Sequence, residues 1–174
     1  VRISSRNAAV SGDHMATLYL VPMKRPSVQD LGKLPLFGGL PEDALRAFAD
    51  QADVQAFEAG HDVFHEEESA RTLYVLESGA LDVIKKTSDG EIVLSRIRPG
   101  ESFGEMSFID MQPRSATVRS AAASTVWMWP YTVLRDRYCK DSKCYTLLVM
   151  NLARELSRRL RRADDLIAST PQRP

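Results

Sequence analysis

A series of short apolar segments between residues 54 and 130 constrains the fold more than any other feature of the sequence. The apolar positions are Val54, Phe57, Val63, Phe64, Leu73, Val75, Leu81, Val83, Ile92, Leu94, Val118, Val126 and Met128. Turn residues separate these segments at Gly60, Ser78-Gly79, Asp89-Gly90 and Pro99-Gly100. The Asp-Gly pair between two apolar segments is a strong β-hairpin signal. Many short strands with regular turns predict a small antiparallel β-barrel or jelly roll.

Helical patterns flank this β region. Ser27 followed by Asp30 is typical of a helix start, and Pro41 with two following acids opens a second helix. After Pro130 an apolar stripe steps by threes and fours through Tyr145, Val149, Leu152, Leu156, Leu160, Ala163 and Ile167. The sequence therefore predicts a mainly β fold with N-terminal helices and a long C-terminal helix. We expect one domain over 27–168, with the barrel at about 54–130 and the C-terminal helices at about 131–168, between tails at 1–26 and 169–174.

Composition excludes several classes of protein. The 174 residues carry a formal net charge of zero, which argues against nucleic-acid binding by the whole chain. The arginines of the last helix are interrupted by acids, and Glu155 with Arg159 forms an i,i+4 pair that we interpret as part of a solvated face. No apolar run is long enough for a membrane span, and no secretion signal is evident, so we expect a cytoplasmic protein with reduced thiols at Cys139 and Cys144. His61 and His65 near three glutamates are interpreted as a solvated loop without metal.

The segment from residue 103 to 118 carries the chemistry. It reads Phe-Gly-Glu-Met-Ser-Phe-Ile-Asp-Met-Gln-Pro-Arg-Ser-Ala-Thr-Val. Small residues let backbone N–H groups approach an anion, and the planar fork of Arg114 holds two phosphate oxygens at once. Glu105 repels phosphate, but its carboxylate accepts a hydrogen bond from a ribose hydroxyl. An anion clamp and a hydroxyl acceptor in one segment indicate a sugar phosphate as ligand.

This segment resembles the phosphate-binding cassette of cyclic nucleotide-binding domains, and the resemblance covers about residues 34–167. It implies a jelly roll in which Glu105 binds the ribose 2′-hydroxyl and Arg114 binds the cyclic phosphate of cAMP or cGMP, with no metal. Backbone groups of Gly104, Met106, Ser107, Ser115 and Ala116 would complete the phosphate cradle. Met111 departs from the family, where glycine is frequent. Glu66-Glu67-Glu68 replace a Gly-Asp turn that we expect to lie far from the ligand.

The resemblance also implies how the base is held. It places the final helix over the purine, near Arg159, Leu160, Ala163 and Asp164, with Val83 and Leu94 on the other side. Ser115 occupies a variable position at which serine accompanies cAMP in similar regulators and threonine often accompanies cGMP. Asp164 would accept hydrogen bonds from either purine, which counts against cAMP. We favour cAMP.

No catalytic constellation is evident, so we expect a regulatory domain rather than an enzyme. Ligand binding would be transmitted through the C-terminal helix to an effector that the sequence does not identify. We expect a homodimer through the stripe from Tyr145 to Ile167, with packing of that stripe within one chain as the alternative. Two other functions stay open: a non-binding relative that serves as a dimerisation or docking module, and a DNA-binding transcription regulator truncated before its reading helix.

Overall fold

The computed structural model describes residues 24–169, except for the side chains of residues 108 and 137–140. Most of the tails expected at 1–26 and 169–174, namely residues 1–23 and 170–174, lies outside the described residues. Three short helices come first: α1 (Val28–Gly32), the 3-10 helix η2 (Pro35–Phe37) and α2 (Glu42–Asp50). The strands are β1 (Asp53–Phe57), β2 (Asp62–Phe64), β3 (Thr72–Thr87), β4 (Gly90–Ile97), β5 (Ser102–Phe103) and β6 (Thr117–Pro130). Helix α3 (Glu105–Ile109) follows β5, and α4 (Tyr131–Lys140) and α5 (Ser142–Ser169) follow β6.

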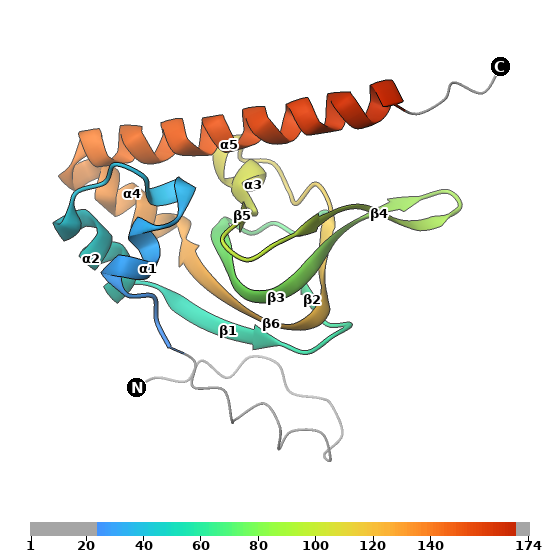
Figure 1. Cartoon of the computed structure of the whole chain (residues 1–174), viewed down its shortest axis with the longest axis horizontal. Coiled ribbons are helices and arrows are strands. Elements are labelled where there is room, and N and C mark those ends of the chain that lie inside the picture. Colours follow the sequence, from blue (N-terminus) through green and yellow to red (C-terminus); the bar gives the residue numbers. More distant parts are fainter. Residues whose placement is uncertain (1–23, 170–174) are drawn as a thin grey trace, which may run out of the picture.

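The strands form one antiparallel sheet that curves into the predicted barrel (Figure 1). Strand β6 pairs with β1, β2 and β3, while β3 also pairs with β4 and β5. The long β3–β6 pair is irregular around Ser78 and Ala80, where Gly79 has a φ of +94°. Bulges of this kind bend a strand and allow a sheet to close. The predicted hairpin is confirmed, since Thr87 pairs with Gly90 at the turn between β3 and β4.

Two apolar clusters fill the space on either side of the curved sheet. One lies between the sheet and the helices, where the ring of Phe37 packs against Phe48 and Trp129. The other lies inside the barrel, where Tyr74 stacks on Phe103 with ring centroids 5.0 Å apart and Phe64 lies beside both. The second cluster is the floor of the candidate site.

The N-terminal helices begin close to the predicted positions. The Ser27 hydroxyl accepts from the Asp30 N–H at 3.1 Å, and the Asp30 carboxylate accepts from the Ser27 N–H at 2.9 Å. This reciprocal pair satisfies donors that the first turn of a helix leaves unpaired. Pro41 lies one residue earlier than predicted, at the N-cap of α2 instead of in its first turn.

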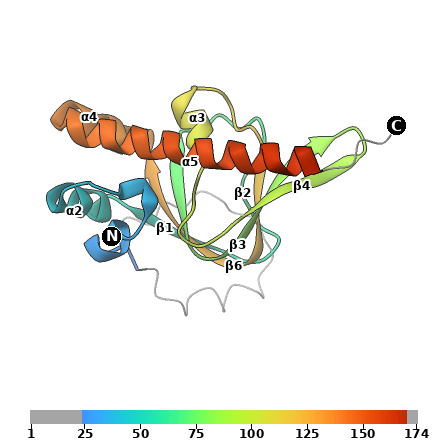
Figure 2. The ribbon, with the colours of Figure 1, turned by 45° about the horizontal axis from the view of Figure 1, so that its top comes forward.

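Helix α5 runs along one side of the molecule and crosses over β5 and α3 (Figures 1 and 2). Its first half is anchored: Cys144, Leu148 and Leu152 are buried, and the Asn151 amide donates to the carbonyls of Leu36 and Gly38 at 3.0 and 2.9 Å. From Leu160 to Ser169 every residue is exposed.

The buried face of α5 differs from the apolar stripe that the sequence suggests. Of that stripe only Leu152 is fully buried, whereas Leu160 and Ile167 are 64 and 74 % exposed. The helix is rotated because Cys144, Leu148 and Asn151, which the pattern does not weight, contact the domain. Packing within the chain therefore leaves the C-terminal part of the stripe uncovered.

Candidate functional site

The candidate site begins where β5 turns into α3. Gly104 makes this turn with a φ of +76°, a conformation that favours glycine. A Cβ at this position would lie 2.7 Å from Nη1 of Arg114 and 3.0 Å from the carbonyl oxygen of Thr72. Glycine is therefore required for the backbone turn and also for the close approach of the Arg114 side chain.

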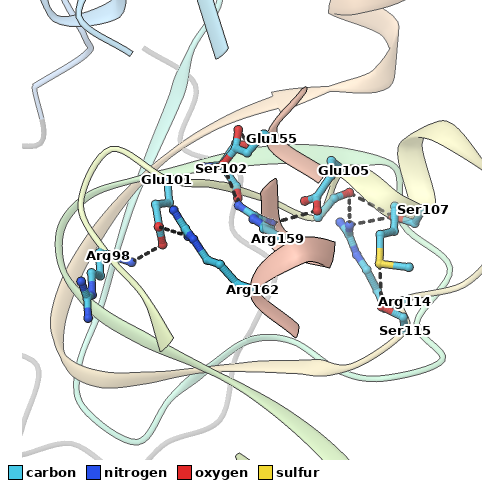
Figure 3. Close-up of polar contacts among 12 residues, drawn as sticks. Arg98, Glu101, Ser102, Glu105, Ser107, Arg114, Ser115, Glu155, Arg159 and Arg162 are labelled. Carbon is cyan, nitrogen blue, oxygen red and sulfur yellow. Dashed lines mark hydrogen bonds and ion pairs between the residues drawn. The ribbon is translucent and has the colours of Figure 1, made fainter. Parts of the chain in front are cut away.

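The side chain of Arg114 is 3 % exposed and is held by backbone carbonyls (Figure 3). Its Nη1 donates to the Gly104 carbonyl at 2.9 Å and to the Ser107 hydroxyl at 2.7 Å, and its Nη2 donates to the Thr72 carbonyl at 3.1 Å. The guanidinium carbon lies 4.2 Å from the ring centroid of Phe64 and 5.4 Å from that of Tyr74. Burial lowers the pKa of Arg114, while Tyr74 and Glu68 act in the opposite direction.

One donor of this arginine is unsatisfied. Arg114 Nε is buried and has no hydrogen-bond partner among the described residues. A guanidinium donates from three nitrogens, and both Nη1 and Nη2 have partners here. Because buried polar groups in native proteins are nearly always paired, an orphan donor of this kind points to a ligand-binding role. A charged N–H suits an anion best.

Glu105, the first residue of α3, is the second buried ionic group and is 5 % exposed. Its Oε1 accepts from Nη1 of Arg159 on α5 at 2.9 Å (Figure 3). Burial raises the pKa of Glu105 above its ordinary value of 4.5, and Arg159 only partly offsets this. The carboxyl group is therefore an acceptor whose desolvation cost is not fully compensated.

Arg159 connects α5 to the start of α3. Its Nη2 donates to the Ser102 carbonyl and to the Glu155 carboxylate, which lies 2.8 Å away. Glu155 also accepts from the Ser102 hydroxyl at 2.8 Å. A hollow of about 120 Å³ is lined by Glu155 and Arg159, and a larger one of about 320 Å³ lies along α5 between Met150 and Arg161; neither hollow is lined by a cassette residue. The interpretation of Glu155–Arg159 as a solvated pair is wrong, because both side chains are part of this junction.

The turn with three glutamates contacts the cassette directly, contrary to our expectation. The Glu67 N–H donates to the Arg114 carbonyl at 2.8 Å, and the Arg114 N–H donates to the Glu68 carbonyl at 3.0 Å. Glu67 and Met111 have φ angles of 67° and 61°, a backbone conformation that favours glycine, and glycine is frequent at the Met111 position in the family that the sequence resembles. No group of His, Cys, Asp and Glu within the described part of the chain could hold a metal ion.

The remaining predicted residues of the cassette and the barrel differ in how far they are buried. Ser107 and Ala116 are buried beside Arg114, and the exposed Ser115 hydroxyl donates to the Met106 sulfur at 3.5 Å. Val83 is half-buried, while Leu94 is 53 % exposed at a bulge of β4.

On α5, Arg159 and Ala163 are four residues apart and share a face. Asp164 is exposed and lies about 140° around the helix from Arg159. Leu160 is also turned away from Arg159, by about 100°. The structure thus brings Gly104, Glu105, Ser107, Arg114 and Arg159 together but not Asp164.

Stability should respond to pH through Glu105. The raised pKa means that the folded state favours the protonated form, so this contribution to stability is complete below pH 4.5 and is lost as the pH rises through the folded-state pKa. Glu105→Gln lacks this titration. We therefore expect the free energy of unfolding of the variant, relative to the unmodified protein, to increase from pH 4 towards pH 7. Urea unfolding across this range measures it, and a difference that is constant or falls with pH contradicts the prediction.

Comparison with known proteins agrees with this geometry. The sequence model of the cyclic nucleotide-binding domain matches residues 54–140. The chain belongs to the cyclic nucleotide-binding domain family. In this family the β-barrel and its helices are a regulatory module, and the jelly-roll fold predicted from the strand pattern is confirmed. No helix among residues 24–169 is both long and apolar enough to cross a membrane.

Individual relatives show how far the likeness extends. The CRP-like cAMP-activated global transcriptional regulator of Mycobacterium tuberculosis is 29 % identical over 139 residues, which are 79 % of this chain and 60 % of that protein. The crystal structure of the Thermus thermophilus catabolite activator protein has a TM-score of 0.65 and 30 % identity, covering 77 % of this chain and 63 % of that one. A cyclic nucleotide-binding domain from Methylobacillus flagellatus has a TM-score of 0.74 with 22 % identity, covering 84 and 83 %. The chain thus spans about three fifths of the length of the regulator.

Proposed function

We propose that this chain is a sensor domain that binds a 3′,5′-cyclic mononucleotide, with the cyclic phosphate on Arg114 and the ribose 2′-hydroxyl on Glu105. The buried, unpaired Nε of Arg114 is the observation that carries this proposal. A phosphate oxygen against Nε satisfies the orphan donor with a charge-assisted hydrogen bond. The backbone amides around Met106, Ser107, Ser115 and Ala116 are proposed to supply further donors. The domain assigned to this function spans residues 27–168.

We propose cAMP as the preferred ligand. Ser115 at the variable cassette position supports it by resemblance, and the exposed position of Asp164 supports it too. The main argument for cGMP is that Asp164 would accept from the N1–H and N2–H₂ groups of guanine. We propose that an aspartate turned away from Arg159 does not make these contacts. Val83, Leu94 and Ala163 are the proposed apolar neighbours of the purine.

Calorimetry on the isolated chain tests both proposals. We expect saturable binding of cAMP, weaker binding of cGMP in a competition titration, and much weaker binding of linear 5′-AMP, which lacks the cyclic phosphodiester. Absence of binding for both cyclic nucleotides would reject the sensor function and leave a docking module as the better account. Displacement of cAMP by a tenfold lower concentration of cGMP would reverse the proposed preference.

The contact between Arg159 and Glu105 suggests how binding is transmitted. Arg159 occupies an oxygen of the carboxylate that the ribose hydroxyl would use. Ligand and α5 therefore compete for Glu105, and binding would favour the arrangement in which Arg159 has left it. A ligand shifts such an equilibrium only by its difference in affinity for the two arrangements. We propose that displacement of Arg159 from Glu105 is the step that allows the C-terminal half of α5 to change position.

Replacing Arg159 with alanine should tighten cAMP binding about threefold to tenfold, because the competing arrangement loses its ion pair. Arg162→Ala is the matched control: this exposed arginine is on the same helix, and its Nη1 lies 3.9 Å from Oε1 of Glu101. We expect no change in affinity for the control. Calorimetric titration of both variants decides the sign, and weaker binding in Arg159→Ala would mean that this side chain contacts the ligand instead.

We also propose a homodimer through the exposed end of α5. Leu160, Ala163 and Ile167 line one side of this segment and are largely uncovered within the chain. Light scattering at tens of micromolar should give the dimer mass, and Leu160→Ser with Ile167→Ser should give the monomer. Leu147→Ser, on another side of α5, is the control that should stay dimeric. A monomer for the unmodified protein, with and without cAMP, would contradict the proposal.

A further inference from the structure

We propose that Lys85 and Glu66 are positioning residues that aim the phosphate-binding half of the cassette; this inference rests on the proposed function. Neither residue is in the cassette. Lys85 lies on β3, and Glu66 lies in the turn between β2 and β3. Their side chains form an ion pair, and the Lys85 Nζ also donates to the Ser115 carbonyl at 2.8 Å.

Glu66 extends this contact into a small network. Its second carboxylate oxygen accepts from the Lys86 N–H at 3.2 Å, and its own N–H donates to the Thr117 hydroxyl at 3.0 Å. The two hydrogen bonds between the backbone of Arg114 and the same turn complete the connection. Three separate segments, the turn at 65–68, strand β3 and residues 114–117, are thus joined around one ion pair.

The geometry of the peptide bond shows what the network controls. The carbonyl of Ser115 and the N–H of Ala116 belong to one planar trans peptide unit, so they point in opposite directions. Because Lys85 holds the Ser115 carbonyl, it also fixes the direction of the Ala116 N–H, away from the lysine. This amide is one of the donors proposed to hold phosphate. Lys85 therefore acts on the ligand through a backbone group instead of by contact.

The same contacts contribute little to stability. The Lys85 side chain is 41 % exposed and that of Glu66 is 13 % exposed, and ion pairs near the surface stabilise proteins only weakly. The hydrogen bond from Lys85 lowers the pKa of Glu66, so the carboxylate stays ionised at neutral pH. Loss of the pair should consequently alter ligand affinity more than folding.

Calorimetry with cAMP as the probe tests this separation. Lys85→Met keeps the length of the side chain and removes its charge, and we expect about tenfold weaker binding with the melting temperature nearly unchanged. Glu66→Gln should show a smaller loss. Lys86→Met is the matched control, since Lys86 contributes its backbone N–H to the network, and it should bind as the unmodified protein does. Equal affinities for Lys85→Met and Lys86→Met would overturn the proposal.

Two further measurements distinguish positioning from general loosening. The first uses the two phosphorothioate diastereomers of cAMP, which each replace one exocyclic oxygen with sulfur, so the ratio of their affinities reports on individual cradle contacts. Lys85→Met should change the ratio of the two affinities. A substitution that only destabilised the fold would weaken both diastereomers equally and leave the ratio constant. An unchanged ratio would contradict the positioning role.

Amide hydrogen exchange, the second measurement, gives a readout that needs no ligand. The Arg114 N–H should exchange faster in Lys85→Met and not in Lys86→Met. If the unmodified protein bound no cyclic nucleotide, the proposed function would fail, and the exchange rates would still decide whether the network holds the cassette. Unchanged exchange in Lys85→Met would reject the network itself.

Discussion

Replacing Arg114 with alanine is expected to weaken cyclic-nucleotide binding at least thirtyfold, which corresponds to about 2 kcal/mol. The substitution removes the buried cation and its unpaired Nε donor. It also removes the Arg114 hydrogen bonds to the carbonyls of Gly104 and Thr72, so the cradle itself loses order. Calorimetric titration with cAMP measures the effect, and an affinity equal to that of the unmodified protein would remove the assignment of Arg114 as the phosphate ligand.

This binding loss has to be separated from a loss of folding. The alanine variant loses the hydrogen bonds from Arg114 to two backbone carbonyls and the contact of its guanidinium with the Phe64 ring. These losses should lower the free energy of unfolding by about 1–3 kcal/mol. Arg114→Lys keeps the charge but not the planar fork, so it should fold better than the alanine variant and still bind weakly. Arg46→Ala, on the exposed face of α2, should change neither property. Urea unfolding alongside each titration identifies any variant that is not folded during the binding measurement.

Gly79→Ala should have the largest effect on folding, a loss of about 3 kcal/mol or more in the free energy of unfolding. The added Cβ would overlap the Ala123 carbonyl oxygen and lie 2.6 Å from Cα of Ser124. Both are backbone atoms of the neighbouring strand β6, so no side-chain rotation relieves the overlap. The φ of +94° adds strain for any residue with a Cβ.

Gly60→Ala separates strain from overlap. Gly60 has a comparable φ of +85°, but a Cβ there would meet no atom within 4 Å. The control should therefore cost only about 1–2 kcal/mol, the part that comes from backbone conformation. Equal losses for the two alanine variants in urea unfolding would show that the close β3–β6 approach at Gly79 relaxes without cost.

The sequence is informative wherever a feature depends on neighbouring residues. The strand pattern with its Asp-Gly turn predicts the barrel, and the contiguous cassette singles out Glu105 and Arg114, which the structure shows to be buried. These features are local, and the backbone geometry that they require depends on a few adjacent residues.

Contacts between distant segments could not be predicted in this way. The orientation of α5 depends on the carbonyls of Leu36 and Gly38, which accept from Asn151, a residue that an apolar stripe does not weight. Arg159 looks solvated in isolation because its i,i+4 partner is a glutamate, and only the fold brings Ser102 and Glu105 to it. The turn at 66–68 departs from the family pattern, yet its backbone pairs with Arg114. No spacing in the sequence encodes these contacts.

The two hydrogen bonds of Asn151 fix one point of α5, and we expect the helix to tilt about this point. Arg159 lies about 12 Å along the helix from this point, and Ser169 lies about 27 Å from it, at about 1.5 Å per residue. A rigid tilt about Asn151 that moves Arg159 by about 1 Å therefore moves the far end by about 2 Å. In the proposed transmission, a small displacement of Arg159 beside Glu105 would therefore become a displacement about twice as large at Ser169, because the segment beyond Leu160 is exposed and has little packing to resist it.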